Sequence, residues 1–317
     1  MDLTLPAPDR APEALRALAA VARANGEPHP QQQRMLELFA EATGVPVDVP
    51  APCSITPEAL AAALTDPRAR RAFVQRLVVM ATLDGEVTEG EVDQIEAFAT
   101  ALDVHEPGVR NLRQIARGYP RLAAISLGRR SFVPRLLAKV WRERGLRGVF
   151  QLVRALLRGR DRAQEARFAA LAELPRDTLG RELYEHFVDN AFPFPGQPRA
   201  APEFLLFHDL GHVLGGYGTS SGEELLIAGF QAGYMKGDGL VMYLMIAMFF
   251  QLGIESVARM RGVEPARERV DIEALLSAVE RGQAMTVNLV DWDPWPHMAR
   301  PLSEVRAELG VRHAPLH

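Results

Sequence analysis

The chain has 317 residues, with 36 Lys+Arg against 40 Asp+Glu, and a net charge of −4. Hydrophobic residues make up 48% and charged residues 24%, which is typical of globular proteins and excludes global disorder. The slight negative charge gives no reason to expect nucleic-acid binding, and a single cysteine, Cys53, excludes an internal disulfide and a cysteine-based zinc site. The first residues lack the basic and apolar segments of a secretory signal, so we expect a cytoplasmic protein.

Apolar residues recur at spacings of three and four along almost the whole chain, and sustained alternation of β-branched residues is missing. This period is typical of helices that bury one face. The longest apolar run, 240–250, is too short to cross a bilayer. We therefore predict an all-α fold with two helical domains, one at 11–120 and one at 162–317. The predicted helices are 12–24, 30–43, 57–64, 67–83, 89–102, 109–117, 133–142, 147–157, 162–173, 179–190, 202–214, 223–235, 239–260, 272–282 and 302–309.

The segment 11–120 contains an internal repeat, because residues 22–45 match residues 81–104 at an offset of 59. Each copy has the pattern of two helices joined by a tight glycine turn, and such duplicated hairpins share one core. The turn of the second copy, Leu83-Asp-Gly-Glu-Val-Thr-Glu-Gly-Glu91, resembles that of the tellurite-resistance TerB-like family. The resemblance implies a small all-helical module.

The acidic turn of the second copy has two interpretations. Asp84, Glu86 and Glu89 could bind a metal ion, although they do not follow the spacing of an EF-hand. Alternatively, Gly85 ends one helix and Thr88 or a neighbour caps the next, where Glu89 and Glu91 are favourable at the positive end. The sequence favours the capping interpretation.

Residues 121–161 form a basic amphipathic connecting region. Between 129 and 160 there are ten basic residues and a single acid, Glu143, with apolar residues such as Trp141 interleaved. This pattern is typical of a segment that lies on an anionic membrane surface. A solvated face at a domain junction is the alternative. We expect peripheral association with such a membrane.

Two histidines carry the clearest chemical signal. His208 and His212 are four residues apart, so both imidazoles leave one face of a helix and can bind one divalent cation. Asp209 is placed to bind the same cation or to hold water on it. After a glycine break, the next helix opens with Glu223 and Glu224, one of which can return to the cation as an oxygen ligand. Acids in a first helical turn also complement the helix dipole, which is the alternative for both.

Two other catalytic patterns overlap this segment and are not favoured. Residues 218–222 match a nucleophile elbow, but that motif requires a preceding strand where the sequence predicts a helix. The His208-Asp209 pair also occurs in phosphohydrolases of the His-Asp type, whose further ligands would have to be His186 and Asp189.

Four segments between 165 and 311 resemble the coenzyme Q biosynthesis protein 4 family. The metal pattern of this family is His-Asp-x-x-His, eleven residues and Glu, which selects Glu224 over Glu223. The resemblance implies an all-helical domain at 162–317 that binds one divalent metal ion, zinc, through His208, Asp209, His212 and Glu224. The matching segments are 174–184, 207–232, 290–295 and 300–310.

The resemblance also implies a role in ubiquinone biosynthesis, on a polyprenylated aromatic lipid that loses its ring carboxylate and is hydroxylated at that carbon. We expect a metal-dependent decarboxylase in which Asp209 and Arg181 are catalytic. Arg181 would hold the substrate carboxylate, and pairing of Arg181 with Glu185 is the alternative. A non-catalytic scaffold that presents prenyl lipids to other quinone-biosynthesis proteins is the alternative function, and a homodimer remains open.

Three departures from the family pattern leave the identity of the prenyl lipid open. They are the added N-terminal module, the Glu223-Glu224 doublet where Gly-Glu is usual, and Gly211 within the ligand helix. Seven of the ten methionines lie from Met235 onward, where flexible thioethers suit either a prenyl lining or an ordinary core.

Overall fold

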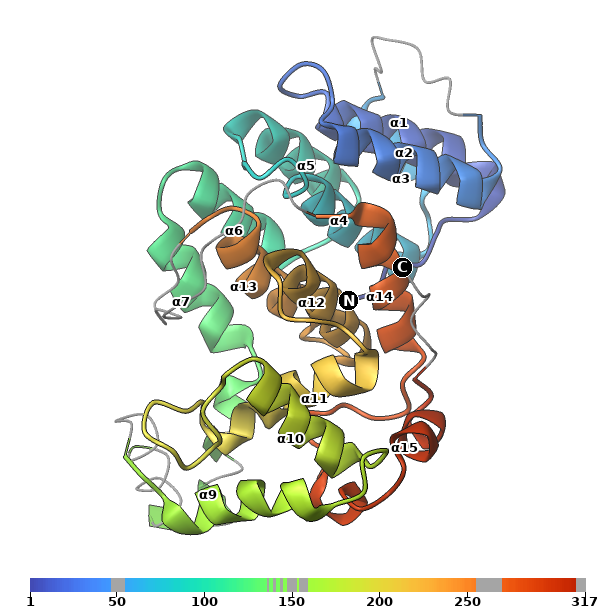
Figure 1. The fold of residues 1–317 in the computed structure, drawn as a ribbon. Helices are drawn as coiled ribbons and strands as arrows, with labels where there is room; N and C mark the ends of the chain where they lie inside the picture. The colour runs from blue at the N-terminus through green and yellow to red at the C-terminus, as the bar shows by residue number, and fades with distance from the viewer. Residues whose placement is uncertain are drawn as a thin grey trace. The chain divides into compact units, whose positions relative to one another are not determined.

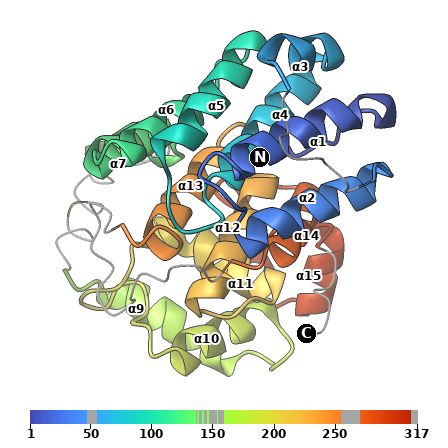
Figure 2. The ribbon, with the colours of Figure 1, turned by 90° about the horizontal axis from the view of Figure 1, so that it is seen from above.

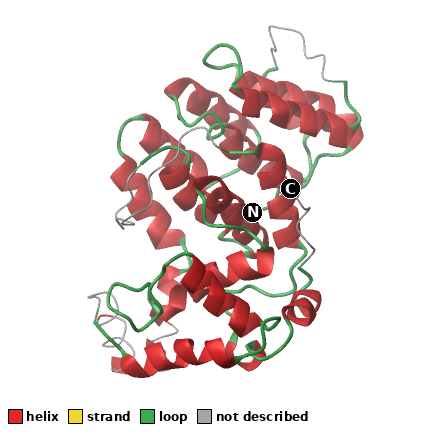
Figure 3. Cartoon of the chain, viewed as in Figure 1, coloured by secondary structure: helices red, strands yellow, loops and turns green. Residues whose placement is uncertain are grey.

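The computed structural model describes residues 1–46, 55–135, 137–138, 141–142, 145–146, 153, 159–254 and 270–311. All regular elements within these residues are helical, and one isolated bridge pairs Thr178 with Pro301 (Figure 3). The predicted all-α fold is confirmed. No helix in this part of the chain is both long and apolar enough to span a bilayer.

The chain divides into two compact units, each described here by itself (Figure 1). The contacts divide the chain at positions other than the predicted domain boundaries. The predicted domains 11–120, 121–161 and 162–317 are not tested by this division and stay a prediction. The first unit comprises Met1–Gly128 and Gly237–Ser277, and the second comprises Arg129–Lys236 and Ala278–His317.

The first unit is a layered packing of helices. Helix α1 packs against α2, α3, α4 and α5, and α6 packs against α4, α5 and α13. Figure 2 shows α5, α6 and α7 following one another along one side of this unit. Its helices are η1 (Pro8–Arg10), α1 (Ala11–Ala22), α2 (Pro30–Thr43), α3 (Pro57–Ala63), α4 (Pro67–Met80), α5 (Glu89–Ala101), α6 (Pro107–Ala116), α7 (Pro120–Arg130), which ends in the second unit, and α13 (Gly239–Phe250).

Several predicted helices differ from those observed. Helix α7 begins at Pro120, where no helix was predicted; proline fits a first helical turn because the N–H that it lacks would have no partner there. Helix α13 ends at Phe250, short of the predicted 260, and its Met242 and Met248 are buried. The described residues of the predicted helix 133–142 are helical, whereas the predicted helix 147–157 lies outside the described residues except for residue 153, as does Cys53.

Helices α2 and α5, which the repeat aligns, begin with the same local structure. His29 caps α2 and Thr88 caps α5. In both helices the side chain of the third residue accepts a hydrogen bond from the backbone N–H of the N-cap residue. These third residues, Gln32 and Glu91, meet each other, with Gln32 Nε2 donating to Glu91 Oε1 at 3.2 Å. Thr88 therefore caps the helix as the capping interpretation of the acidic turn predicted.

Glu91 is a buried carboxyl at the contact between the two copies, only 1% exposed. Burial raises the pKa of Glu91 to about 7, and the neighbouring Asp84 adds to the rise. Contacts between the copies are also reciprocal. Thr88 Oγ1 donates to Asn25 Oδ1 at 2.9 Å, and at the matching pair burial raises the pKa of Asp84 while His29 of the first copy acts to lower it.

The second unit places α11 against α10 and α12. The helix predicted at 202–214 is present as a 3₁₀ turn, η3 (Glu203–Leu205), followed by α11. Helix α14 (Ile272–Gln283) begins in the first unit and ends in the second. The other helices of the second unit are α9 (Arg162–Ala169), η2 (Ala170–Glu173), α10 (Leu179–Asp189), α11 (Leu206–Gly215), α12 (Ser221–Tyr234), η4 (Trp295–His297) and α15 (Leu302–Glu308).

Helix α12 and the end of α14 cross with their backbones in contact. A Cβ atom at Gly282 would lie 2.0 Å from Phe230 O, and one at Gly233 would lie 2.3 Å from Val279 O. No side chain fits at either position unless the helices separate. This crossing fixes α12, whose first turn supplies part of the site described next.

Candidate metal centre

Helix α11 carries His208 and His212 on one face. Their spacing of four residues brings the two Nε2 atoms to 3.3 Å from each other. The helix ends at Gly215, and Gly216 follows in the left-handed conformation with φ 70°. A glycine suits this position because it adopts positive φ without steric cost, and the chain can then turn back toward α12.

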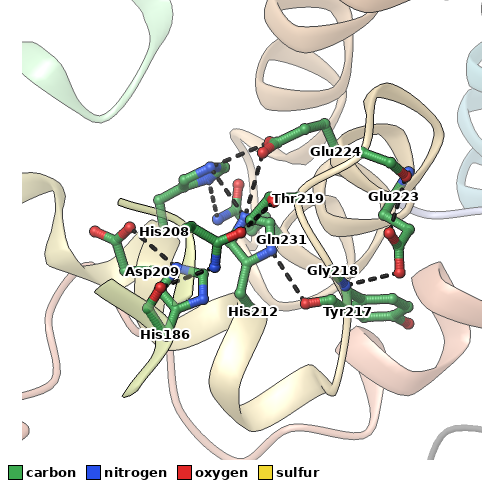
Figure 4. A network of polar contacts seen from close by, with 12 residues as sticks. His186, His208, Asp209, His212, Tyr217, Gly218, Thr219, Glu223, Glu224 and Gln231 are labelled. Atoms are coloured by element: carbon green, nitrogen blue, oxygen red, sulfur yellow. Dashed lines mark hydrogen bonds and ion pairs between the residues drawn. The ribbon is translucent and has the colours of Figure 1, made fainter. Parts of the chain in front are cut away.

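Glu224 reaches the two histidines from the first turn of α12. Its Oε2 lies 3.3 Å from His208 Nε2, and its Oε1 lies 3.6 Å from His212 Nε2. Among the described residues, these three form the group whose potential ligand atoms all lie within 4.8 Å of one another (Figure 4). The group could hold a metal ion.

The spacing of these atoms fits tetrahedral coordination. Ligand atoms about 2.0–2.1 Å from a tetrahedral ion lie about 3.3 Å from each other, which is the distance of His208 Nε2 both from His212 Nε2 and from Glu224 Oε2. Glu224 Oε2 is buried and has no hydrogen-bond partner in the part of the chain that the structure describes. A buried carboxylate oxygen without a donor is costly, and a cation would satisfy it.

The electrostatics of the two histidines differ. Burial, followed by the proximity of His208, lowers the pKa of His212 to about 4, so this ring is neutral, the form that binds metals. Burial also acts to lower the pKa of His208, but the adjacent Glu224 carboxylate outweighs it and the pKa is raised. Glu224 thus stabilises positive charge at this point.

The turn after α11 fixes the tautomer of His212. Its Nδ1 lies 3.3 Å from the main-chain oxygen of Tyr217. A carbonyl oxygen only accepts, so Nδ1 carries the hydrogen and Nε2 presents its lone pair toward Glu224. A main-chain partner of this kind is typical of metal-binding histidines.

Two arginines hold the C-terminal carbonyl groups of α11. Arg281 Nη2 donates to Gly215 O at 2.7 Å, and Arg306 Nη2 donates to Val213 O at 2.8 Å. Positive side chains are favourable at the negative end of a helix, where carbonyl groups lack partners. They stabilise the turn that carries His212.

Asp209 lies outside the three-residue group. One position along α11 turns it by about 100° from His208, and its Oδ1 lies 3.6 Å from His186 Nε2 of α10. That His186 atom is buried and has no hydrogen-bond partner among the described residues, while its ring stacks on His212 with centroids 5.2 Å apart. The assignment of Asp209 as a metal ligand stays a prediction; Figure 4 shows it beside His186.

Glu223 closes the turn before α12. Its Oε1 accepts from Gly218 N–H and its Oε2 from the Ser220 hydroxyl, both at 2.8 Å. Partial burial acts to raise the pKa of Glu223, but these hydrogen bonds outweigh it and the pKa is lowered. Glu224 and not Glu223 therefore lies beside the histidines, and its assignment as the metal ligand stays a prediction.

Arg181 forms hydrogen bonds with residues that are close to it in the sequence. Its Nε donates to Glu185 Oε1 at 2.7 Å, and its Nη1 donates to the main-chain oxygen of Ala172. The pairing with Glu185 was the alternative to a substrate contact. The catalytic role of Arg181 stays a prediction.

Three residues around the site were missed by sequence reasoning. Gln231 is fully buried, with its Nε2 3.1 Å from His208 Nδ1. It follows Glu224 by seven residues, two helical turns, so the spacing on a predicted helix was a usable signal. Arg281 and Arg306 come from distant segments, and no local pattern marks them.

Comparison of the chain with protein-family models, with curated proteins and with solved structures finds no match. The metal centre is therefore argued from its own geometry: two imidazoles, one carboxylate and a buried oxygen without a donor.

Proposed function

We propose that the protein binds one zinc ion through His208, His212 and Glu224. The observation that carries this proposal is that one ligand atom from each of the three residues lies within 4.8 Å of the others, with His208 Nε2 3.3 Å from both His212 Nε2 and Glu224 Oε2. Imidazole and carboxylate ligands in a tetrahedral arrangement are typical of zinc. Three protein ligands are the usual number in catalytic zinc sites, whereas structural sites use four. Among the residues that the structure describes the group offers three ligands, a number that favours an enzyme over a scaffold.

The proposed reaction is decarboxylation of a polyprenylated aromatic acid in quinone biosynthesis. The four segments that resemble the coenzyme Q biosynthesis protein 4 family support this substrate class. When bound, zinc supplies Lewis-acid attraction for carboxylate oxygens. Decarboxylation breaks the bond between ring and carboxyl carbon, and a proton replaces the carbon dioxide that leaves. Hydroxylation at that carbon would also require an oxidant.

The pair of His186 and Asp209 is suited to supply that proton. The two side chains lie 3.6 Å apart, and the His186 ring stacks on His212, a proposed zinc ligand. An imidazole beside a carboxylate can pass a proton to a reacting carbon and be restored from solvent. Asp209 would hold the imidazole in the orientation that this transfer requires.

The proposed place of action is an anionic membrane surface, with the prenyl chain of the substrate remaining in the bilayer. In the basic connecting region, Trp141 is 57% exposed and Leu146 is 77% exposed, so both are available for contact with lipid. Each basic residue near an anionic surface contributes about 1 kcal/mol. Apolar insertion and charge would then act together.

Two measurements on the full chain test this proposal. Elemental analysis after zinc loading and dialysis should give about one zinc per chain, lost when His208 and His212 are both changed to Ala; His105→Ala, at an exposed histidine, is the control. Release of labelled carbon dioxide should be measured from a prenylated aromatic acid on anionic vesicles.

Full zinc retention by the double variant would contradict the metal site. Zinc binding without carbon dioxide release would contradict the enzymatic role and favour the lipid-presenting scaffold. Release that His186→Gln abolishes while zinc content is kept would support the proton-transfer role of His186.

A further inference from the structure

Gln231 is a buried amide packed against the candidate metal centre. Its Nε2 lies 3.1 Å from His208 Nδ1, on the far side of the ring from Glu224. Its Oε1 is buried without a hydrogen-bond partner among the described residues. A Cβ atom at Gly211 would lie 3.4 Å from Gln231 Nε2, so the amide packs closely on the backbone of α11.

The role of His208 decides which amide atom should face it. His208 Nε2 lies 3.3 Å from both His212 Nε2 and Glu224 Oε2, so this nitrogen is the one that a cation would use. A neutral imidazole that presents a lone pair on Nε2 carries its hydrogen on Nδ1. The group 3.1 Å from Nδ1 must then accept a hydrogen bond.

A glutamine amide provides that acceptor by a half-turn of its end group. The oxygen and nitrogen exchange places in this rotation, and the hydrogen-bond partners determine which arrangement is correct. With the oxygen toward His208, Oε1 is no longer a buried acceptor without a donor, which is a costly state. The exchange thus gives the ring N–H and the amide oxygen a partner in each other, and it moves the amide nitrogen to the buried position that Oε1 held.

We infer that Gln231 is a positioning residue whose Oε1 accepts from His208 Nδ1–H and so directs the Nε2 lone pair toward the cation. The inference rests on the proposed metal site. With this hydrogen bond both histidines carry their hydrogen on Nδ1, because the main-chain oxygen of Tyr217 holds His212 in the same tautomer. Outer partners of this kind typically change metal affinity by about 10–100-fold.

Three variants of the full chain test the role of Gln231. Gln231→Met keeps the length of the side chain and removes the acceptor, whereas Gln231→Glu keeps an acceptor. Gln251→Met is the matched control, because Gln251 is also buried, has an Oε1 without a partner among the described residues, and donates to Leu83 O at 3.0 Å in the first unit. Zinc affinity is measured by competition with a chelating dye, and the ring hydrogens by nitrogen-15 NMR.

Gln231→Met should weaken zinc binding by about 10–100-fold. Gln231→Glu should bind at least as tightly as the wild type, and Gln251→Met should leave the affinity unchanged. In the zinc-loaded wild type, the Nδ1 hydrogen of His208 should be protected from solvent exchange, and this protection should be lost in Gln231→Met.

Each contrary result has a distinct meaning. If the wild type binds zinc and Gln231→Met binds it equally well, the role of Gln231 is overturned and the metal site stands. The same holds if Gln231→Glu is as weak as Gln231→Met. If the wild type binds no zinc, both proposals fail.

Discussion

Glu91 should make the stability of the first unit depend on pH, and Glu91→Gln should remove that dependence. The carboxyl is 1% exposed and accepts hydrogen bonds from Thr88 N–H at 3.1 Å and from Gln32 Nε2 at 3.2 Å. Burial raises its pKa from 4.5 to about 7. The folded protein therefore keeps a proton at pH values where the unfolded chain has released it.

A raised carboxyl pKa favours the folded state at low pH. Below pH 4.5 Glu91 is protonated in both states, and its contribution to the free energy of unfolding is fully present. This contribution is lost as the pH rises from 4.5 through about 7, because the folded state must then hold a buried negative charge. At about 1.36 kcal/mol per pH unit, the loss amounts to about 3 kcal/mol.

Urea denaturation of wild type and Glu91→Gln at several pH values checks this magnitude. The glutamine is neutral throughout, so the difference in unfolding free energy between the two proteins should change by about 3 kcal/mol between about pH 4.5 and pH 8, in favour of the variant. Glu86→Gln removes an exposed charge from the same turn and should reproduce the wild-type profile. A difference between wild type and Glu91→Gln that stays constant over this range would refute the reasoning.

Three further outcomes are expected. Glu224→Gln should lose most zinc binding, because it removes the carboxylate charge between the histidines, whereas Glu223→Gln should keep it; elemental analysis decides, and the reverse pattern would assign the ligand to Glu223. Gly282→Ala should lower the unfolding free energy by at least about 2 kcal/mol, since its Cβ would lie 2.0 Å from a backbone oxygen; an unchanged melting temperature would show that the crossing relaxes freely. Changing Trp141 and Leu146 to Ser should weaken binding to anionic vesicles at least about tenfold through lost apolar insertion; equal co-sedimentation of both proteins would exclude a membrane role for these side chains.

The metal group was the most predictable part of the site, because its spacing is local. His208 and His212 follow from helical periodicity, whereas the residues after the glycine break left Glu223 and Glu224 open, and the resemblance to a known family selected Glu224. Asp209 shows the limit of that reasoning: adjacency in sequence places it on another side of the helix, beside His186. Helical geometry could have indicated this before the structure did.

Contacts between distant segments were not predictable from a single sequence. Arg281 and Arg306 bind carbonyl groups of α11 that are more than sixty residues away in the sequence. The residues next to them in the sequence do not distinguish them from exposed arginines. Gly282 is an ordinary helix C-terminal glycine in the sequence, and its close approach to α12 appears only when both helices are placed. The all-α class was predictable, since it depends on periodicity rather than on partners.

The contacts between the two hairpins of the first unit are of the kind that joins the two chains of a two-fold symmetric dimer. In such a dimer, residues on the axis meet their own copies. Two chains of the second hairpin would set Glu91 against Glu91 and bury two carboxyls together, whereas two chains of the first would set Gln32 against Gln32. The single chain places one of each on the axis, where amide and carboxyl bond at 3.2 Å. The two hairpins are therefore not interchangeable. A chain built by repeating either hairpin would lose the hydrogen bond between Gln32 and Glu91.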